Sequence, residues 1–208
     1  MTARYWDRQA ASYDARTAGV ERRFLAASRH WIADRASGDT LEVAVGTGAN
    51  LPYYPEPLVL SGVDWSPAML EVARRRARET GREVRLEQAD AAALPFPEAS
   101  FDTVVCTFSM CCLPDVEAAL TEAVRVLRPG GRLLLADHIR ASNWPLRAVQ
   151  HAVDLVSVPL QGEHYTRRPL LTLRGLGGRS DAGRAVEIVE TERLTLGAIE
   201  RVHARTPQ

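Results

Sequence analysis

The sequence predicts an α/β fold with a doubly wound, mostly parallel seven-stranded sheet, an antiparallel last strand and helices on both faces. Short apolar runs alternate with segments of helical periodicity, as in parallel strands joined by crossover helices. The first apolar run breaks into a glycine turn, which is typical of the ligand-binding edge of such a sheet. The chain has 208 residues and no repeat or dividing linker, which suits a single domain over residues 1–208.

The N-terminal segment is expected to lie outside the sheet. Residues 2–16 are polar and carry the aromatic residues Tyr5, Trp6 and Tyr13, and residues 20–36 place apolar side chains at helical spacing. We therefore expect N-terminal lid helices at 1–36, a core at 38–140, and further helices and closing strands at 141–208.

Five apolar runs predict the parallel strands, at residues 40–45, 58–63, 84–88, 101–107 and 132–137. Helices are predicted at 66–80, 115–127 and 145–160, the first of them capped by Ser66 with Pro67 at its first position. Residues 167–184 indicate a short helix and a glycine-rich surface loop. Residues 185–190 and 193–201 are expected to close the sheet as an antiparallel pair.

Composition narrows the function classes. Basic and acidic residues both number 26, so no dominant field for nucleic acid or an anionic membrane is expected, although a local basic patch stays open. The absence of lysine excludes P-loop and Schiff-base lysines. Cys106, Cys111 and Cys112 lack disulfide and zinc spacing, which favours a metal-free protein of the reducing cytoplasm. No apolar run approaches the ~20 residues of a membrane-spanning helix.

Four motifs stand in order near the ends of the expected strands. The first strand leads through Glu42 and Ala44 into the turn Gly46-Thr47-Gly48, and Leu51 occupies the third glycine position of a dinucleotide fingerprint. Asp64 ends the second strand, where an acid can accept both hydroxyls of a ribose. Asp90-Ala91 follows the third strand, and the turn Arg128-Pro129-Gly130-Gly131 precedes the fifth.

Together these motifs resemble those of class I S-adenosylmethionine (SAM)-dependent methyltransferases of the UbiE-like type, over residues 38–140. Ala44 departs from the pattern, which has a glycine at that position. The resemblance implies a Rossmann-like sheet, SAM as cofactor, S-adenosylhomocysteine as product, and methyl transfer to a small-molecule or lipid acceptor with an N, S, O or C nucleophile.

The resemblance also implies the cofactor contacts. Asp64 is expected at the ribose, Trp65 on the adenine face, and Asp90 with the Ala91 N–H at the adenine edge. The alternatives are a second helix cap for Asp64, rim packing for Trp65 and a turn hydrogen bond for Asp90. The full expected set is Tyr5, Tyr13, Glu42, Ala44, Gly46, Thr47, Gly48, Asn50, Asp64, Trp65, Met69, Asp90, Ala91, Thr107, Phe108 and Ser109.

A narrower resemblance points to thiol methyltransferase-like and phosphatidylethanolamine N-methyltransferase-like proteins. It depends on residues 50–55, residues 107–114 and Asp137-His138-Ile139-Arg140. It leaves the acceptor undetermined.

A nucleophile that loses a proton needs a base, and histidine titrates near neutrality. His138, at the end of the fifth strand, is the first candidate, with a structural pairing to Asp137 as its alternative role, and His164 is the second. Tyr5 or Tyr13 can stabilise a sulfonium by cation–π attraction. The cysteines are expected to pack as small hydrophobic residues.

Two other classes compete with a methyltransferase. Leu51 and the Arg128–Gly131 turn disfavour a nicotinamide-dependent oxidoreductase. A non-catalytic SAM-binding regulator stays open as an alternative because of Ala44 and the lack of an unambiguous base. No appended basic domain suggests a nucleic-acid partner. We expect a small-molecule or lipid partner and a monomer or homodimer.

The helix predicted over 145–160, with Trp144 just before it, carries a stripe of apolar residues that ends at Leu160. We expect this stripe to pack in the core or to line the acceptor pocket. A membrane-lying helix that delivers a lipid substrate is the alternative, and peripheral membrane contact stays open.

Overall fold

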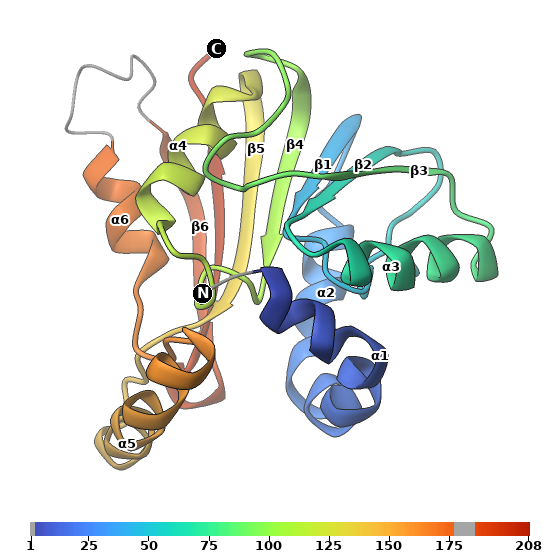
Figure 1. Ribbon diagram of the computed structural model, residues 1–208. Helices are drawn as coiled ribbons and strands as arrows, with labels where there is room; N and C mark the ends of the chain where they lie inside the picture. The colour runs from blue at the N-terminus through green and yellow to red at the C-terminus, as the bar shows by residue number, and fades with distance from the viewer. Residues whose placement is uncertain (1–2, 177–185) are drawn as a thin grey trace.

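The computed structural model describes residues 3–176 and 186–208 (Figure 1). Seven strands form one sheet in the order β3-β2-β1-β4-β5-β7-β6. They are β1 (Asp39–Val43), β2 (Val59–Asp64), β3 (Val84–Gln88), β4 (Phe101–Thr107), β5 (Leu127–His138), β6 (Glu187–Leu194) and β7 (Ile199–Arg205). The first five strands pair in parallel, and β7 runs antiparallel to both β5 and β6. The predicted fold class, with its antiparallel last strand, is confirmed.

The strand order reverses between β1 and β4, which makes the topological switch point where open α/β sheets bind ligands. Both strands are almost completely buried, as expected for apolar runs covered on two faces. The edge strand β6 instead alternates between exposed and half-buried residues. The switch point therefore lies in the rigid centre of the sheet.

Helices cover both faces of the sheet (Figure 1). They are α1 (Ala3–Val20), a π-helical turn η1 (Glu21–Leu25), α2 (Ala26–Ala33), α3 (Pro67–Glu79), α4 (Val116–Arg125), α5 (Trp144–Gln161) and α6 (Pro169–Leu176). Leu120 of α4 and Leu170 of α6 pack in one buried cluster, and Trp31 and Ile32 of α2 pack in the other. The expected cap at Ser66 is confirmed, because its Oγ accepts from Met69 N at 3.2 Å.

The structure moves several predicted boundaries. The N-terminal aromatic segment and the predicted 20–36 helix form one helical run from Ala3 to Ala33, interrupted only by the π-helical turn η1. Strand β5 begins at Leu127, whereas the predicted strand begins at 132. The last strand, β7, ends at Arg205, about four residues after the predicted end at 201. Residues 177–183 of the predicted glycine-rich loop lie outside the described residues.

The expectation that the apolar stripe of α5 forms core is wrong. Its side chains at Trp144, Val149, Val153, Val156 and Leu160 are exposed. The buried residues of α5 are Gln150 and Ser157, both polar. Within the described residues, no helix is both long enough and apolar enough to cross a membrane.

Candidate functional site

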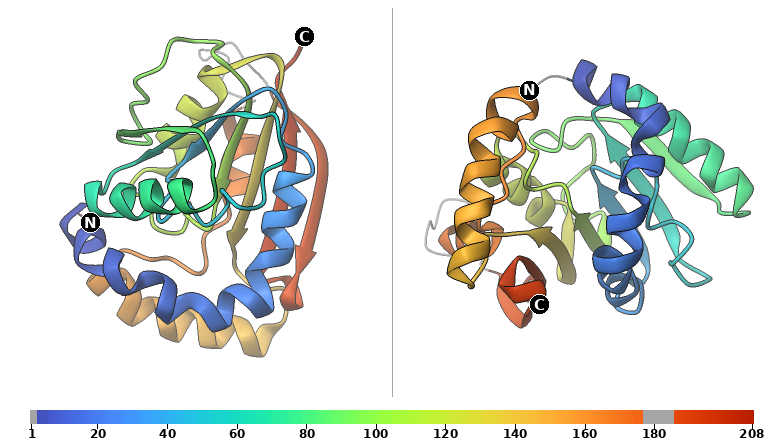
Figure 2. Two further views of the ribbon diagram at one scale, coloured as in Figure 1. Left: turned by 90° about the vertical axis from the view of Figure 1, so that its right-hand side faces the viewer. Right: turned by 90° about the horizontal axis from the view of Figure 1, so that it is seen from below.

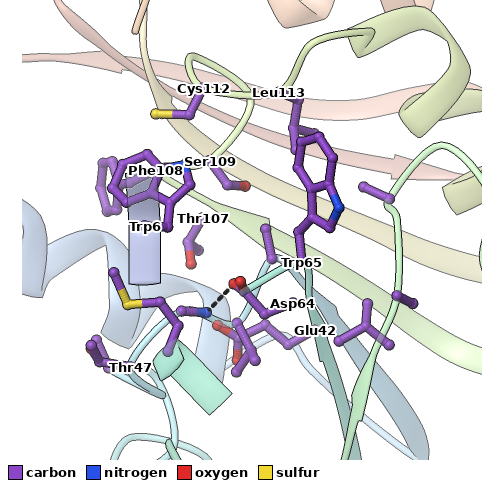
Figure 3. A pocket seen from close by; sticks show the side chains of 18 of the residues that line it. Trp6, Glu42, Thr47, Asp64, Trp65, Thr107, Phe108, Ser109, Cys112 and Leu113 are labelled. Carbon is purple, nitrogen blue, oxygen red and sulfur yellow. Dashed lines mark hydrogen bonds between the residues drawn. The ribbon is translucent and has the colours of Figure 1, made fainter. Parts of the chain in front are cut away.

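A cavity lies at the carboxyl ends of β1, β2 and β4, with about 930 Å³ free of protein atoms and partly open to solvent. Figure 3 shows the labelled side chains around this cavity, among them the acids Glu42 and Asp64 and the aromatic residues Trp6, Trp65 and Phe108. Most of the expected cofactor residues line it. These are Tyr13, Glu42, Ala44, Gly46, Thr47, Asp64, Trp65, Met69, Asp90, Ala91, Thr107, Phe108 and Ser109.

Three expected residues do not line this cavity. The Tyr5 hydroxyl donates to Gln161 Oε1 at 2.9 Å, which joins α1 to α5. Gly48 adopts φ +74°, and a Cβ there would come within 2.8 Å of Leu51 Cδ1. Asn50 is buried in a hydrogen-bond network behind the cavity. Gly48 is therefore a packing position rather than part of the cavity wall.

The turn after β1 needs left-handed backbone at two cavity-lining positions. Gly46 has φ +56°, and a Cβ built there meets no atom within 4 Å, so the space beside it belongs to the cavity. Ala44 has φ +55°, a conformation that costs an L-residue roughly 1–2 kcal/mol. The family's glycine is therefore explained by backbone geometry, and alanine occupies the position under strain.

Asp64 holds this turn while facing the cavity. Its Oδ2 accepts from Gly46 N (dashed line in Figure 3) and its Oδ1 from Ser66 N, both at 2.8 Å. Desolvation raises the pKa of the carboxyl, opposed by these backbone N–H groups. The Trp65 N–H also acts on this carboxylate, and since each oxygen has two lone pairs, three backbone donors leave an acceptor position for a ligand.

Behind the cavity wall lies a buried polar network centred on Glu42. Its carboxylate accepts from Asn50 Nδ2 at 2.8 Å and from the Tyr54 hydroxyl at 2.9 Å. Arg29 Nη1 donates to Asn50 Oδ1 at 2.8 Å, while Arg29 Nε and Nη2 bind both oxygens of Glu21. Burial raises the pKa of Glu42 to about 7, against the hydrogen bonds that favour the carboxylate.

The turn after β4 is held by Asp137. The Asp137 carboxylate accepts from Ser109 N at 3.1 Å, Met110 N at 2.6 Å and His138 N at 2.7 Å. Burial raises its pKa to about 6 despite these donors. The Ser109 hydroxyl is buried, lines the cavity, and has no hydrogen-bond partner among the described residues. A polar group in the cavity can supply that partner.

Asp90 lies on the cavity wall after β3, and its Oδ1 also accepts from Ala92 N at 2.9 Å. The turn hydrogen bond considered as its alternative role is therefore present. It uses one oxygen and leaves the other available to a ligand.

Helix α1 lies over the cavity and is tied down by two acids. Asp7 accepts from Ser66 Oγ at 2.6 Å, and Asp14 accepts from Thr47 Oγ1 at 2.8 Å and pairs with Arg76 at 2.5 Å. These contacts bring Trp6 and Tyr13 of α1 to the cavity. Burial raises the pKa of Tyr13, so it stays a neutral phenol.

Trp6 and Arg29 are the two large polar or aromatic side chains of the cavity wall that the expected cofactor set lacks. Trp6 was noted only as an aromatic residue, although its spacing of seven from Tyr13 places both on one helix face. Arg29 carried no motif; its guanidinium lies 5.4 Å from the centre of the Phe108 ring and is buried. An arginine inside an otherwise apolar helix face is the signal that could have drawn attention to it.

Neither histidine candidate lines the cavity. The His138 ring lies 5.1 Å from Phe108 and 5.8 Å from Tyr165, centre to centre, and desolvation lowers its pKa to about 4. His164 N donates to Cys111 O, and its side-chain pKa is also lowered by desolvation. Both imidazoles are neutral at pH 7.

Cys106 lies in β4, and Cys111 and Cys112 lie in the turn after it. Cys106 and Cys111 are buried, Cys112 lines the cavity, and burial raises the pKa of the Cys106 thiol. Within residues 3–176 and 186–208, Cys111, Cys112 and Glu163 form the one group of three metal-type ligands within 4.8 Å of one another.

Comparison with known proteins places this architecture. Residues 41–135 match the family model described as a methyltransferase domain. The chain is 41% identical over 118 residues to phosphatidylethanolamine N-methyltransferase of Cereibacter sphaeroides, covering 56% of this chain and 58% of that protein. It is 32% identical over 170 residues to ubiquinone/menaquinone biosynthesis C-methyltransferase UbiE of Hahella chejuensis, covering 77% and 68%. The chain thus spans little more than half of the first relative's length.

A solved SAM-dependent methyltransferase from Thermotoga maritima superposes with a TM-score of 0.71 at 23% identity, over 96% of this chain and 97% of that one. The fold is therefore that of Rossmann-like methyltransferases. The chain belongs to the SAM-dependent methyltransferase family, and its cofactor is SAM.

The cavity fits this cofactor by its own geometry. The free space beside Gly46 admits a ligand close to the backbone, and Asp64 offers acceptors for hydroxyl groups. The unpartnered Ser109 hydroxyl and the buried Arg29 provide polar groups for a charged end.

Proposed function

We propose that this chain transfers a methyl group from SAM to a lipophilic small-molecule or lipid acceptor. The observation that carries the proposal is the cavity at the β1–β4 switch point, where Gly46 leaves open space beside the Asp64 carboxylate. This is the arrangement a nucleoside needs: close backbone approach and a fixed acceptor for its hydroxyls.

In this proposal the adenosine half of SAM is bound by residues at the carboxyl ends of the strands. Asp64 accepts the ribose hydroxyls through the lone pairs left by Gly46 and Ser66. Trp65 covers the adenine face, and Asp90 with the Ala91 N–H binds its edge. Met69, which is buried and lines the cavity, completes the apolar wall.

The other half is held by the lid and the buried network. Arg29 uses three of its N–H donors on Glu21 and Asn50, and its two remaining donors suit the carboxylate of the methionyl group. Ser109 and Thr107 border the reacting methyl group. Glu42 and Asn50 act indirectly, by fixing Arg29 and Thr107.

Bound SAM supplies a methyl group already activated by the sulfonium, so the protein's task is to orient the acceptor and exclude water. Trp6, Tyr13 and Phe108 form an aromatic wall at that end of the cavity. Aromatic faces attract a cation by ~0.5–2 kcal/mol, which favours the sulfonium over the neutral thioether product.

His138 and His164 remain the proposed bases for an acceptor that must lose a proton. Both are neutral at pH 7, and the pKa of about 4 makes His138 the weaker base unless the bound substrate raises it. The His138 ring lies behind Phe108, so this role requires Phe108 to move aside or a water molecule to relay the proton. An acceptor that reacts without proton loss needs neither residue.

The acceptor class is inferred from the relatives and from the lining. The names of the relatives concern a phospholipid and quinones, which are lipophilic. The lining includes the apolar side chains of Trp6, Phe108, Leu113 and Pro114, which suits an apolar acceptor. A non-catalytic SAM-binding regulator is the second candidate, favoured by the strained Ala44 and by the absence of a histidine among the described residues that line the cavity.

Calorimetric titration with SAM, S-adenosylhomocysteine and NAD separates the classes of cofactor. A tritiated-methyl transfer screen against phosphatidylethanolamine, demethylated quinols, thiols and amines then separates enzyme from regulator. SAM binding with transfer to a lipophilic acceptor is the expected result. Binding of NAD but not SAM contradicts the proposal, and SAM binding with no transfer to any acceptor favours the regulator.

A further inference from the structure

Helix α5 has its polar and apolar sides reversed relative to an ordinary surface helix. Its inward stripe is polar: Gln150, Asp154, Ser157 and Gln161 follow one another at helical spacing. Gln150 binds Ala141 N and Ile139 O at 2.8 Å, and Ser157 Oγ donates to Glu163 O at 2.8 Å. The helix is thus docked by hydrogen bonds, and its orientation is fixed.

The outward face of α5 is apolar and carries no exposed formal charge. Trp144 is 72% exposed, Leu155 79% and Leu160 69%. Asp154, the acid of the helix, is half-buried and accepts from Tyr165 N and Thr166 Oγ1. Leu196, 67% exposed, extends the face, because its carbonyl accepts from the N–H groups of Ser142 and Asn143 just before α5. An apolar patch of this kind marks an interaction site.

The helices α1 and η1 lie at the same end of the molecule as α5, where the parallel strands end (Figure 2). Their exposed charged residues are Arg4, Arg8, Arg16, Arg22 and Arg23, whereas the partly exposed Asp14 carboxylate is paired with Arg76. Their three acids are half-buried and engaged inside the protein. Asp7 binds Ser66, Asp14 binds Thr47 and Arg76, and Glu21 binds Arg29.

We propose that the outward face of α5 and the arginines of α1 and η1 together bind the surface of an anionic lipid bilayer. Apolar side chains enter the headgroup boundary while arginines meet lipid phosphates, which is how interfacial helices bind. The chain has zero net charge, but its charges are unevenly distributed here. The arginines of α1 and η1 are exposed, whereas the acids Asp7, Asp14 and Glu21 bind groups inside the protein.

A second copy of the chain is the less suitable occupant. The carboxylates of α1 and η1 are already hydrogen-bonded or ion-paired within the protein, and so is Asp154 of α5, so an interface made from two such surfaces gives the five arginines no free acidic partner. Burying unpaired charges is costly, whereas lipid phosphates pair with them.

The surface deepens the proposed function, because Tyr5 joins α1 to α5 beside the cavity and a lipophilic acceptor can enter from the bilayer. Vesicle binding nevertheless needs neither SAM nor methyl transfer. A result that contradicts membrane binding is therefore distinguishable from one that contradicts the proposed methyl transfer.

The test is flotation of the purified chain with vesicles of phosphatidylcholine alone or of phosphatidylcholine and phosphatidylglycerol. The wild type is expected to float with the anionic vesicles and less at high salt. Leu155→Glu with Leu160→Glu is expected to reduce binding by at least about tenfold. Arg22→Gln with Arg23→Gln is expected to reduce binding to anionic vesicles by about 25-fold, at roughly fivefold per arginine.

Matched controls lie elsewhere on the molecule. Val59→Glu changes an exposed apolar residue at the start of β2, and Arg78→Gln with Arg85→Gln removes two exposed arginines from α3 and β3. Both should float like the wild type, and circular dichroism confirms folding of every variant. Wild-type protein that floats with neither vesicle, or an α5 variant that floats normally, overturns the proposal. Dimerisation lost in the α5 variant, without flotation of the wild type, assigns the face to a second copy instead.

Discussion

The two halves of the cavity are built in different ways. The adenosine side consists of strand ends: the turn after β1, Asp64 after β2 and Asp90 after β3. The lid and acceptor side consists of helix α1, Arg29 of α2 and the turn after β4, and α1 is held by side-chain hydrogen bonds such as Tyr5–Gln161 and Thr47–Asp14. The first side is fixed by the sheet, and the second by contacts that a few substitutions can release.

The largest effect is expected on the adenosine side, from Asp64→Ala. This change removes two charge-assisted acceptors, each worth about 1.5–3 kcal/mol, so SAM affinity should fall about 100-fold or more. Isothermal titration measures it, with the exposed Asp34→Ala as control. An affinity within threefold of wild type would place the ribose elsewhere.

The buried network joining the two halves gives a pH prediction. Glu42 has a pKa of about 7 in the folded chain against an ordinary 4.5, so the folded state takes up its proton more readily. Protonated Glu42 therefore contributes to the free energy of unfolding fully below pH ~4, and this contribution is lost as the pH rises from 4.5 through 7. The total loss is up to about 3 kcal/mol, at 1.36 kcal/mol per pKa unit. Asp137 titrates over an overlapping range, with a pKa of about 6.

Glu42→Gln isolates this contribution. Urea unfolding should show the variant more stable than wild type at pH 8, by about 1–3 kcal/mol, with the difference vanishing at pH 4. Asp34→Asn is the matched exposed control. A difference in unfolding free energy that does not change with pH would mean that the pKa of Glu42 is not raised in the folded chain.

Ala44→Gly tests the strain on the adenosine side. Glycine adopts φ +55° without a Cβ penalty, so the free energy of unfolding should rise by about 0.5–1 kcal/mol and SAM binding should be equal or tighter. Ala99, also at positive φ but remote from the cavity lining, provides the control Ala99→Gly. Clearly weaker SAM binding in Ala44→Gly would show that the turn differs from the family's.

The smallest effect is expected in the lid. Asp14→Asn weakens the half-exposed ion pair with Arg76 and should cost stability by about 0.5 kcal/mol or less. The same change loosens α1, so KM for the acceptor should rise more than KM for SAM in a steady-state assay. Glu71→Gln, which removes an exposed ion pair within α3, is the control. Equal changes in both KM values would argue that α1 has no separate part in holding the acceptor.

This contrast also explains what the sequence could predict. Strand ends and turns carry local signals, so Asp64, Gly46 and the cap Ser66 were found from spacing and residue type. Arg29 and Trp6 reach the cavity only through the path of the N-terminal helices, which no local pattern determines. Gly48 was assigned to the ligand, but its Cβ position meets Leu51, a neighbour visible only in the fold.

Helix α5 shows the limit of periodicity most clearly. An apolar stripe normally predicts a buried face. Here the polar stripe is buried instead, because Gln150 and Ser157 bind backbone groups of the flanking segments 139–141 and 163–165. Those partners depend on how the chain returns after α5, and the pattern of α5 alone does not contain that information.

The most direct test of the central claim is a crystal structure with S-adenosylhomocysteine. The account predicts the ribose hydroxyls within hydrogen-bond distance of the Asp64 carboxylate, and the amino-acid end toward Arg29 and Ser109. A product molecule bound outside this cavity, or bound within it with its ribose away from Asp64, would contradict the account.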